Sequence, residues 1–128
     1  MAADPAFVDT NALVYANQRR AKDHERAVAC LESLAREGAA LWISRQILRE
    51  YVAAVTRPQG DTAALPMVLA VQRVQNFASQ FEIAEDGPEV HRVWLGLLQQ
   101  VPISGKQVHD ANFVATMLAH GVTRAAHL

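Results

Sequence analysis

Short apolar runs alternate along the chain with longer segments whose apolar residues recur every three or four positions. The runs predict strands at 6–9, 41–43 and 81–84, because a buried strand reads as a short continuous apolar stretch. Residues 122–123 begin a fourth candidate strand. The helical spacing predicts helices over 23–38, 44–57, 61–80, 88–100 and 106–120, and residues 10–16 form a loop or a first turn.

Residues with strong positional preferences mark the ends of these segments. Ser44 is a good N-cap for the second helix, and Pro58 stops that helix. Gly38 and Gly121 stand where the first and last helices end, and Gly87 precedes the proline that opens another. These signals support the alternation of strands with helices.

The helix over 61–80 rests on a less clear pattern. Asp61 or Thr62 is its expected cap, and Pro66 falls within its opening turns, where proline is tolerated. Its expected core-facing stripe consists of Leu65, Val68, Leu69 and Val71.

Strands that alternate with helices favour a three-layer α/β/α architecture with a central parallel sheet. The chain has 128 residues and is 51% hydrophobic, which suits one well-packed domain spanning 1–128. We therefore expect an α/β fold with helices on both faces of the sheet.

Charge and cysteine content narrow the functional classes. The net charge of −1 gives no general attraction to nucleic acid, so any such contact has to be local. Cys30 is the only cysteine, which excludes an intramolecular disulfide and suits a reducing cytoplasm. No apolar stretch is long enough to cross a bilayer, and Asp4 stands where a signal peptide would be basic. A cytoplasmic protein without a membrane partner is expected.

Three carboxylates occupy positions that need an explanation. Asp9 directly follows the first apolar strand, and Glu50 lies in the helix after the second strand with small and apolar neighbours on its flank. The helical neighbours of Asp110 are Phe113, Val114 and Met117, so we expect this carboxylate on a largely buried stripe. A buried carboxylate needs a compensating cation.

The carboxyl edge of a parallel sheet is where open α/β folds bind ligands, and all three acids can open on it. Hard oxygen ligands there suit Mg²⁺ or Mn²⁺, which hold a phosphodiester and lower the pKa of an attacking water. Thr10 and Asn11 are the supporting polar residues beside Asp9. A phosphotransferase with Asp9 as nucleophile is an alternative, although it would want a second Asp where Asn11 stands.

Three short motifs carry a resemblance to a known family. They are Phe7-Val8-Asp9-Thr10-Asn11, the helix with Ser44 followed by Arg49-Glu50-Tyr51, and Gly105 followed by His109-Asp110-Ala111 and an apolar helix closed by His120-Gly121. In this order the motifs resemble the PIN-domain ribonucleases, in particular toxins of the VapC type. The resemblance covers nearly the whole chain.

The resemblance implies an endoribonuclease that depends on Mg²⁺ or Mn²⁺ and cuts RNA with a metal-activated water. It places Asp9, Glu50 and Asp110 on the acidic positions of the family and Asn11 on its polar position. It also implies a homodimer and an inhibitory antitoxin partner. Candidate contacts with RNA are Arg45, Arg49, Lys106 and His109.

The chain departs from the family pattern after the last helix. The family continues into a strand with a further polar or acidic group, whereas residues 111–128 contain no Asp or Glu. We therefore expect the last strand or strands of the sheet to be truncated. The alternative function is a catalytically weakened or inactive PIN domain that acts through dimerisation or antitoxin binding.

Overall fold

The first strand, β1 (Ala6–Val8), is completely buried in the centre of the molecule. In the computed structural model, which describes residues 3–58 and 60–126, it lies in a four-stranded sheet of order β3-β2-β1-β4. The other strands are β2 (Leu41–Ser44), β3 (Glu82–Ala84) and β4 (Arg124–Ala126). Every pairing is parallel, with Phe7 opposite Trp42 on one side and Ala125 on the other. The expected parallel sheet is confirmed.

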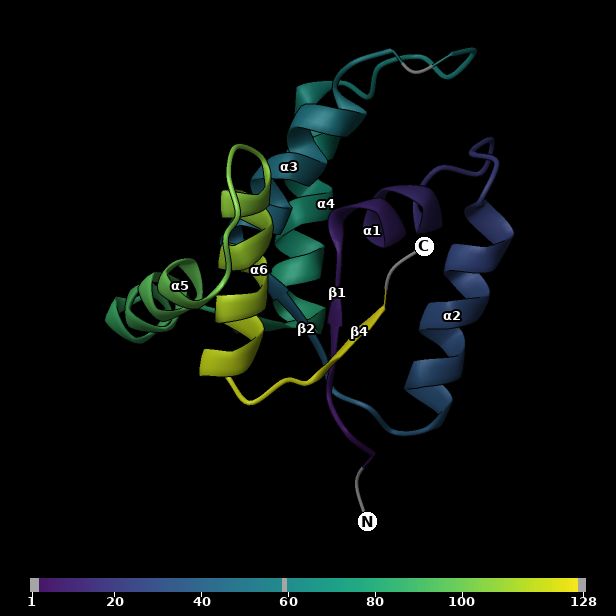
Figure 1. The fold of residues 1–128 in the computed structure, drawn as a ribbon. Coiled ribbons are helices and arrows are strands. Elements are labelled where there is room, and N and C mark those ends of the chain that lie inside the picture. Colours follow the sequence, from purple (N-terminus) through teal and green to yellow (C-terminus); the bar gives the residue numbers. More distant parts are fainter. Residues whose placement is uncertain (1–2, 59, 127–128) are drawn as a thin grey trace.

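Parallel strands need long crossover connections, and helices supply them here. The helices of the described residues are α1 (Thr10–Ala16), α2 (His24–Arg36), α3 (Arg45–Val55), α4 (Met67–Gln80), α5 (Pro88–Gln100) and α6 (Gln107–Ala119). Figure 1 shows α2 and α6 on opposite sides of the strands, with α5 outside α6. This arrangement confirms the three-layer α/β/α prediction.

Local signals set most of the observed boundaries. The Ser44 hydroxyl accepts a hydrogen bond from the Ile47 amide, 3.2 Å away, as an N-cap does. Gly38 and Gly121 adopt positive φ angles of 81° and 71° just after α2 and α6, a conformation that glycine reaches without strain. The prediction for residues 10–16 was incomplete, since they form the whole helix α1 and not merely a loop or first turn.

The prediction that a helix begins at Asp61 or Thr62 is wrong. Helix α4 begins at Met67, after Pro66 at its N-cap position. Proline disfavours helical backbone in the residue before it, and the Leu65 amide instead donates to the Val55 carbonyl at 2.7 Å. The chain therefore returns to the end of α3 at Leu65, just before α4 begins.

Most of the expected core-facing stripe is also wrong, although Leu65, which precedes the helix, is partly buried against the core. Val68, Leu69 and Val71 are 66%, 41% and 47% exposed, whereas the buried residues of α4 are Ala70 and Phe77. The Phe77 ring meets Tyr51 of α3 edge-on, with ring centroids 5.0 Å apart. Helix α4 therefore packs on α3 through the face that carries Ala70 and Phe77, and this contact helps to bury Tyr51 completely.

The C-terminal segment contributes a fourth strand to the sheet. Strand β4 begins at Arg124, slightly later than the predicted 122–123, and pairs along its whole length with β1. Val122 is nevertheless fully buried, so it anchors the turn into this strand. The sheet of the described residues therefore extends beyond the three strands that the pattern predicts most clearly.

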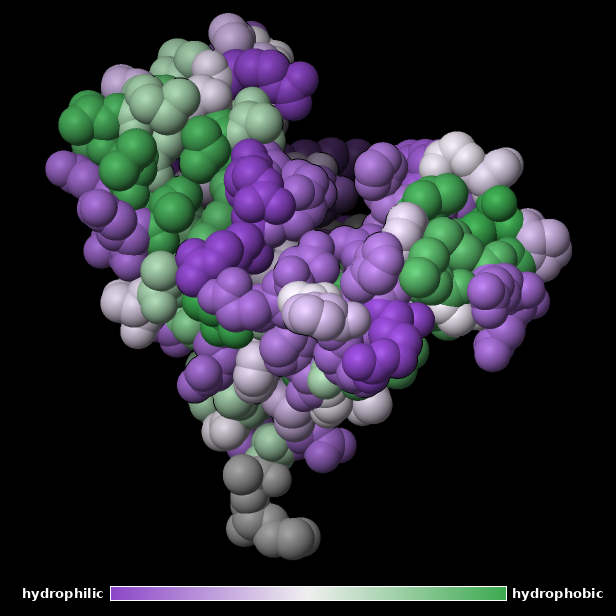
Figure 2. Space-filling model, turned by 90° about the vertical axis from the view of Figure 1, so that its left-hand side faces the viewer, coloured by the Kyte–Doolittle hydropathy of each residue, from purple (hydrophilic) through white to green (hydrophobic). Residues whose placement is uncertain are grey.

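Apolar side chains also reach the surface. The large exposed ones include Met67 and Val68 on α4, and Leu95, Val114 and Leu118 on α5 and α6. Figure 2 shows apolar side chains gathered in two patches with hydrophilic side chains between them. Within the described residues, no helix is long and apolar enough to cross a membrane.

The difference between the two faces of the α3–α4 pair is testable with matched valines. Val55 of α3 is 1% exposed and Val68 of α4 is 66% exposed. We expect Val55→Ala to lower the free energy of unfolding by about 2 kcal/mol, through lost burial and a residual cavity. Val68→Ala should change it by less than about 0.5 kcal/mol. Urea unfolding of both variants measures the difference, and equal losses would contradict this packing.

Candidate functional site at the carboxyl edge of the sheet

Asp9 links the buried strand β1 to helix α1. Its backbone is extended, and its Oδ1 accepts a hydrogen bond from the Ala12 amide at 2.8 Å. Its own amide donates to the Ala126 carbonyl of β4 at 3.2 Å. The carboxylate thus satisfies one of the free donors at the start of α1 and lies at the positive end of that helix. Both contacts fix its position at the carboxyl edge of the sheet.

Glu50 is joined to the residue beside Asp9. The Thr10 hydroxyl donates to Glu50 Oε2 at 2.6 Å, although the two residues are 40 positions apart. Gln46 Nε2 donates to Glu50 Oε1 at 3.2 Å. The structure therefore brings Glu50 of α3 next to the Asp9–Thr10 pair, and both of its carboxylate oxygens accept hydrogen bonds.

Asp110 lies in the first turn of α6 and is exposed. The prediction of a largely buried stripe is only partly right. Phe113 and Met117 are partly buried against the core, but Asp110 and Val114 are exposed. The buried residues of α6 are Ala111, Ala115 and Thr116. The Asp110 carboxylate is therefore solvated, and burial alone does not require a cation there. Its position in the first turn is favourable because of the helix dipole.

The connectivity places the start of α6 on the same side of the sheet as Asp9. Helix α6 leads into β4, which is parallel to β1, so α6 has to begin near the carboxyl edge and end near the other (Figure 1). One turn after Asp110, the Phe113 ring meets Phe7 of β1 edge-on, with centroids 5.1 Å apart.

The donor set can be compared with the needs of a hard metal ion. Carboxylate and hydroxyl oxygens from Asp9, Thr10 and Glu50 are the chemistry that Mg²⁺ and Mn²⁺ prefer. Among residues 3–58 and 60–126, no three His, Cys, Asp or Glu side chains lie close enough together to hold a metal ion. The oxygen chemistry fits such an ion, while the three acids are not gathered in this conformation.

The other candidate residues lie around these acids. Asn11 is exposed in the first turn of α1. The Arg49 guanidinium donates to Gln46 Oε1 at 2.9 and 3.2 Å, so Arg49 is linked through Gln46 to Glu50. Lys106 and His109 are exposed at the start of α6, close in sequence to Asp110.

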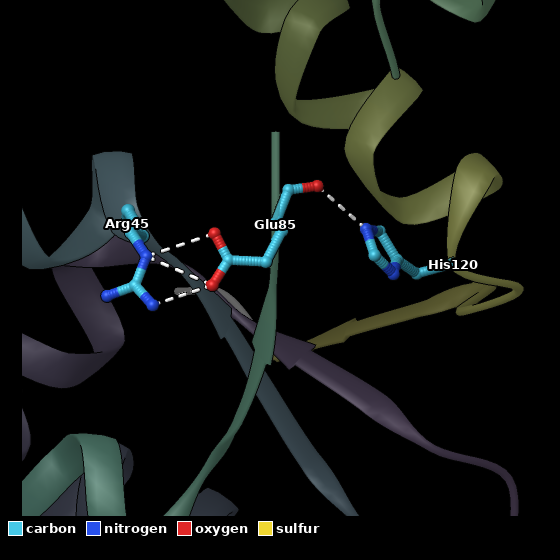
Figure 3. A network of polar contacts seen from close by, with 3 residues as sticks. All are labelled: Arg45, Glu85 and His120. Carbon is cyan, nitrogen blue, oxygen red and sulfur yellow. Dashed lines mark hydrogen bonds and ion pairs between the residues drawn. The ribbon is translucent and has the colours of Figure 1, made fainter. Parts of the chain in front are cut away.

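Arg45 is held by an acidic residue that the sequence analysis did not select. Its guanidinium donates to both carboxylate oxygens of Glu85 at 2.6 to 3.1 Å, and a nitrogen of the His120 ring lies 2.9 Å from the Glu85 carbonyl oxygen (Figure 3). Glu85 directly follows β3, as Asp9 directly follows β1. Its position directly after a predicted strand was the signal by which Glu85 could have been found in the sequence.

The Arg45 hydrogen bonds and charge lower the pKa of the Glu85 carboxyl, with a smaller contribution from His120. The same pairing raises the pKa of Arg45. Because the Glu85 pKa is lower in the folded chain, its contribution to stability is present at neutral pH. That contribution is lost as the pH falls below the ordinary pKa of 4.5 and through the folded value.

The origin of this pKa shift can be tested by removing the guanidinium. In Arg45→Ala we expect the pKa of Glu85 to rise back toward its ordinary value, measured by NMR titration of its side-chain carboxyl. Arg92→Ala, which breaks the Arg92–Glu89 pair on α5, is the control and should leave the Glu85 pKa unchanged. An unaltered Glu85 pKa in Arg45→Ala would show that the bidentate pair does not form in solution.

Comparison with known proteins gives consistent matches over nearly the whole chain. The family model of the PIN domain matches residues 6–127. The curated protein Ribonuclease VapC24, from two strains of Mycobacterium tuberculosis, is 28% identical over 121 residues, which cover 93% of this chain and 82% of that protein.

Solved structures show the same fold at lower identity. VapC20 of Mycobacterium tuberculosis, described as a sarcin–ricin loop cleaving toxin, matches with a TM-score of 0.68 and 18% identity, covering 96% of this chain and 88% of its own. VapBC2 from Rickettsia felis, bound to a DNA fragment of its promoter, matches with a TM-score of 0.63 and 20% identity, covering 96% and 86%. At such identities the structural likeness concerns the fold.

Proposed function

The chain belongs to the PIN domain family, and on this premise we propose that it is a VapC-type toxin that hydrolyses phosphodiester bonds of RNA with Mg²⁺ or Mn²⁺. The likeness to a curated ribonuclease over 93% of the chain supports this reading. The single structural observation that carries it is the 2.6 Å hydrogen bond from Thr10 to Glu50, which joins two acidic segments at the carboxyl edge.

Asp9, Glu50 and Asp110 would hold the divalent ion through their carboxylate oxygens. When bound, such an ion supplies a water of lowered pKa and neutralises charge on the scissile phosphate. The three carboxylates are not gathered in this conformation, and a bound cation would offset their mutual repulsion and allow them to approach one another.

The remaining residues would position these acids and the substrate. The hydrogen bond by which Asp9 caps α1 would hold its carboxylate in place, and Thr10 would orient Glu50. Asn11 would position a water or the Asp9 carboxylate. Arg49, Lys106 and His109 are the candidate contacts with RNA. Arg45 is a fourth candidate, and contact with a phosphate would require it to leave Glu85.

We further propose a cognate antitoxin protein, a homodimer and a cytoplasmic location. The antitoxin rests on the likeness to the solved VapBC2 complex, and the location on the proposed RNA substrate. A cytoplasmic toxin of this kind would need an inhibitor to be harmless to its own cell.

The second candidate is a PIN domain that binds an antitoxin or dimerises without cutting RNA. Residues 111–128 contain no Asp or Glu, so this part of the chain adds no further carboxylate to the three. Each hard anionic ligand adds to the affinity for the metal, and a smaller set binds it more weakly.

Cleavage of RNA separates the two candidates. We expect purified chain to cut single-stranded or structured RNA with Mg²⁺ or Mn²⁺, and Asp9→Asn or Asp110→Asn to slow cutting by about 100-fold or more. Asn caps a helix about as well as Asp, so Asp9→Asn should stay folded. Glu89→Gln on α5 is the carboxylate control and should cut normally.

Two outcomes would count against the first proposal. Cleavage by both Asp variants at the rate of the unmodified chain would remove the proposed acids from the reaction. No cleavage by the unmodified chain, together with measurable antitoxin binding, would favour the inactive PIN domain.

Metal binding has its own readout in thermal stability. An ion that binds only the folded chain should raise the melting temperature, since 100-fold excess over Kd contributes about 2.7 kcal/mol. We expect millimolar Mn²⁺ or Mg²⁺ to raise it by several degrees in the unmodified chain and by less in Asp9→Asn. An identical rise in both would place the ion elsewhere, and differential scanning fluorimetry measures it.

A further inference from the structure

A pocket of about 420 Å³ lies between the α1–α2 and α3–α4 connections, and none of Asp9, Glu50 and Asp110 lines it. One wall comes from the first connection and the end of α1, and the other from residues 60–62. The lining residues are Tyr15, Gln18, Arg20, Ala21, Lys22, Gly60, Asp61 and Thr62. Six of these eight residues carry polar side chains.

Two cations of this pocket are not neutralised by the protein itself. Within the described residues, neither Arg20 nor Lys22 takes part in an ion pair or a side-chain hydrogen bond. Asp61 is the one acidic residue among the lining residues, and both Arg20 and Asp61 are exposed. The pocket therefore presents two positive charges against one negative charge.

The wall that carries these cations is held by contacts with the core. Arg73 of α4 donates to the Asn17 carbonyl at 3.1 Å and also to the hydroxyl of buried Tyr51 at 3.2 Å. A ring nitrogen of His24 lies 2.8 Å from the Tyr15 carbonyl. Both ends of the α1–α2 connection are thereby fixed, so the wall that carries the two cations is not a free loop.

Helix α1 connects this pocket with the acidic site. Asp9 caps its start, and Tyr15 lies in its last turn six residues later, a rise of about 9 Å. At about 3.4 Å per nucleotide of a stacked strand, that distance corresponds to two or three nucleotides. One strand can therefore reach both places.

We propose that this pocket binds a nucleotide of single-stranded RNA two or three positions from the bond that is cut. The inference rests on the proposed ribonuclease function and deepens it. Arg20 and Lys22 contact two successive backbone phosphates, and Asp61 accepts a hydrogen bond from the amino group of a base such as cytosine. The near-neutral net charge of the chain is consistent with such a local grip.

RNA binding tests the proposal without cleavage. The anisotropy of a labelled single-stranded oligonucleotide is measured against salt concentration in Asp9→Asn protein, with and without Arg20→Ala/Lys22→Ala. We expect the pocket variant to bind about tenfold more weakly, and its log–log salt slope to fall by about 1.4, or 0.7 for each lost phosphate contact.

A second pair of substitutions controls for net charge. Arg36→Ala/Arg92→Ala removes the same two charges from α2 and α5, and should leave the salt slope nearly unchanged. The role of Asp61 is tested with oligocytidine and oligouridine probes. The unmodified pocket should prefer oligocytidine, and Asp61→Ala should remove that preference.

The outcomes distinguish this inference from the proposed function. Equal affinity and salt slope for the pocket variant and its control would overturn the pocket, even if the unmodified chain cuts RNA. Weakened binding of inorganic phosphate with unchanged binding of RNA would also overturn it. A pocket variant that binds RNA weakly, in a chain that never cuts RNA, would support the pocket and reject the ribonuclease.

Discussion

The burial of β1 between two parallel neighbours is the constraint on which the rest of the structure depends. All three of its residues are completely buried, and the backbone of β1 is bonded to β2 on one side and β4 on the other. Charged side chains have to lie beyond the ends of this strand, because a charged group buried inside the sheet would be costly. Asp9 is the first residue after the buried strand, and its side chain caps the N-terminus of α1.

Long-range polar contacts gather where the strands end. Thr10 binds Glu50, and Arg45 binds Glu85, each across 40 residues of sequence. These contacts divide the edge into two parts of different charge. At one part Glu85 is neutralised by a bidentate guanidinium, while at the other Glu50 accepts hydrogen bonds from the uncharged side chains of Thr10 and Gln46. The proposed metal ion would lie beside Glu50, where these donors bring no positive charge.

Helix α1 lies between the proposed metal site and the proposed RNA-binding pocket. The acids lie at its start and the cationic pocket at its end, so the phosphate grip and the metal site are separated by a rigid spacer. Such an arrangement would allow a chain of net charge −1 to bind a polyanion. Attraction from two well-placed cations is local, whereas a broad basic face would be required without a pocket.

The sequence by itself determined most of the elements and the location of the first two acids. Apolar periodicity, the Ser44 cap and the Gly87-Pro88 pair depend on local backbone preferences, and the strand-end position of Asp9 follows from them. Other features were decided only by the tertiary structure, and these are the ones that the sequence predicted wrongly or did not indicate. The start of α4, the exposure of Val68 and Asp110 and the Arg45–Glu85 pair all depend on which segment packs against which. Helical spacing shows that residues share a face, but distant parts of the chain decide whether that face meets the core or the solvent.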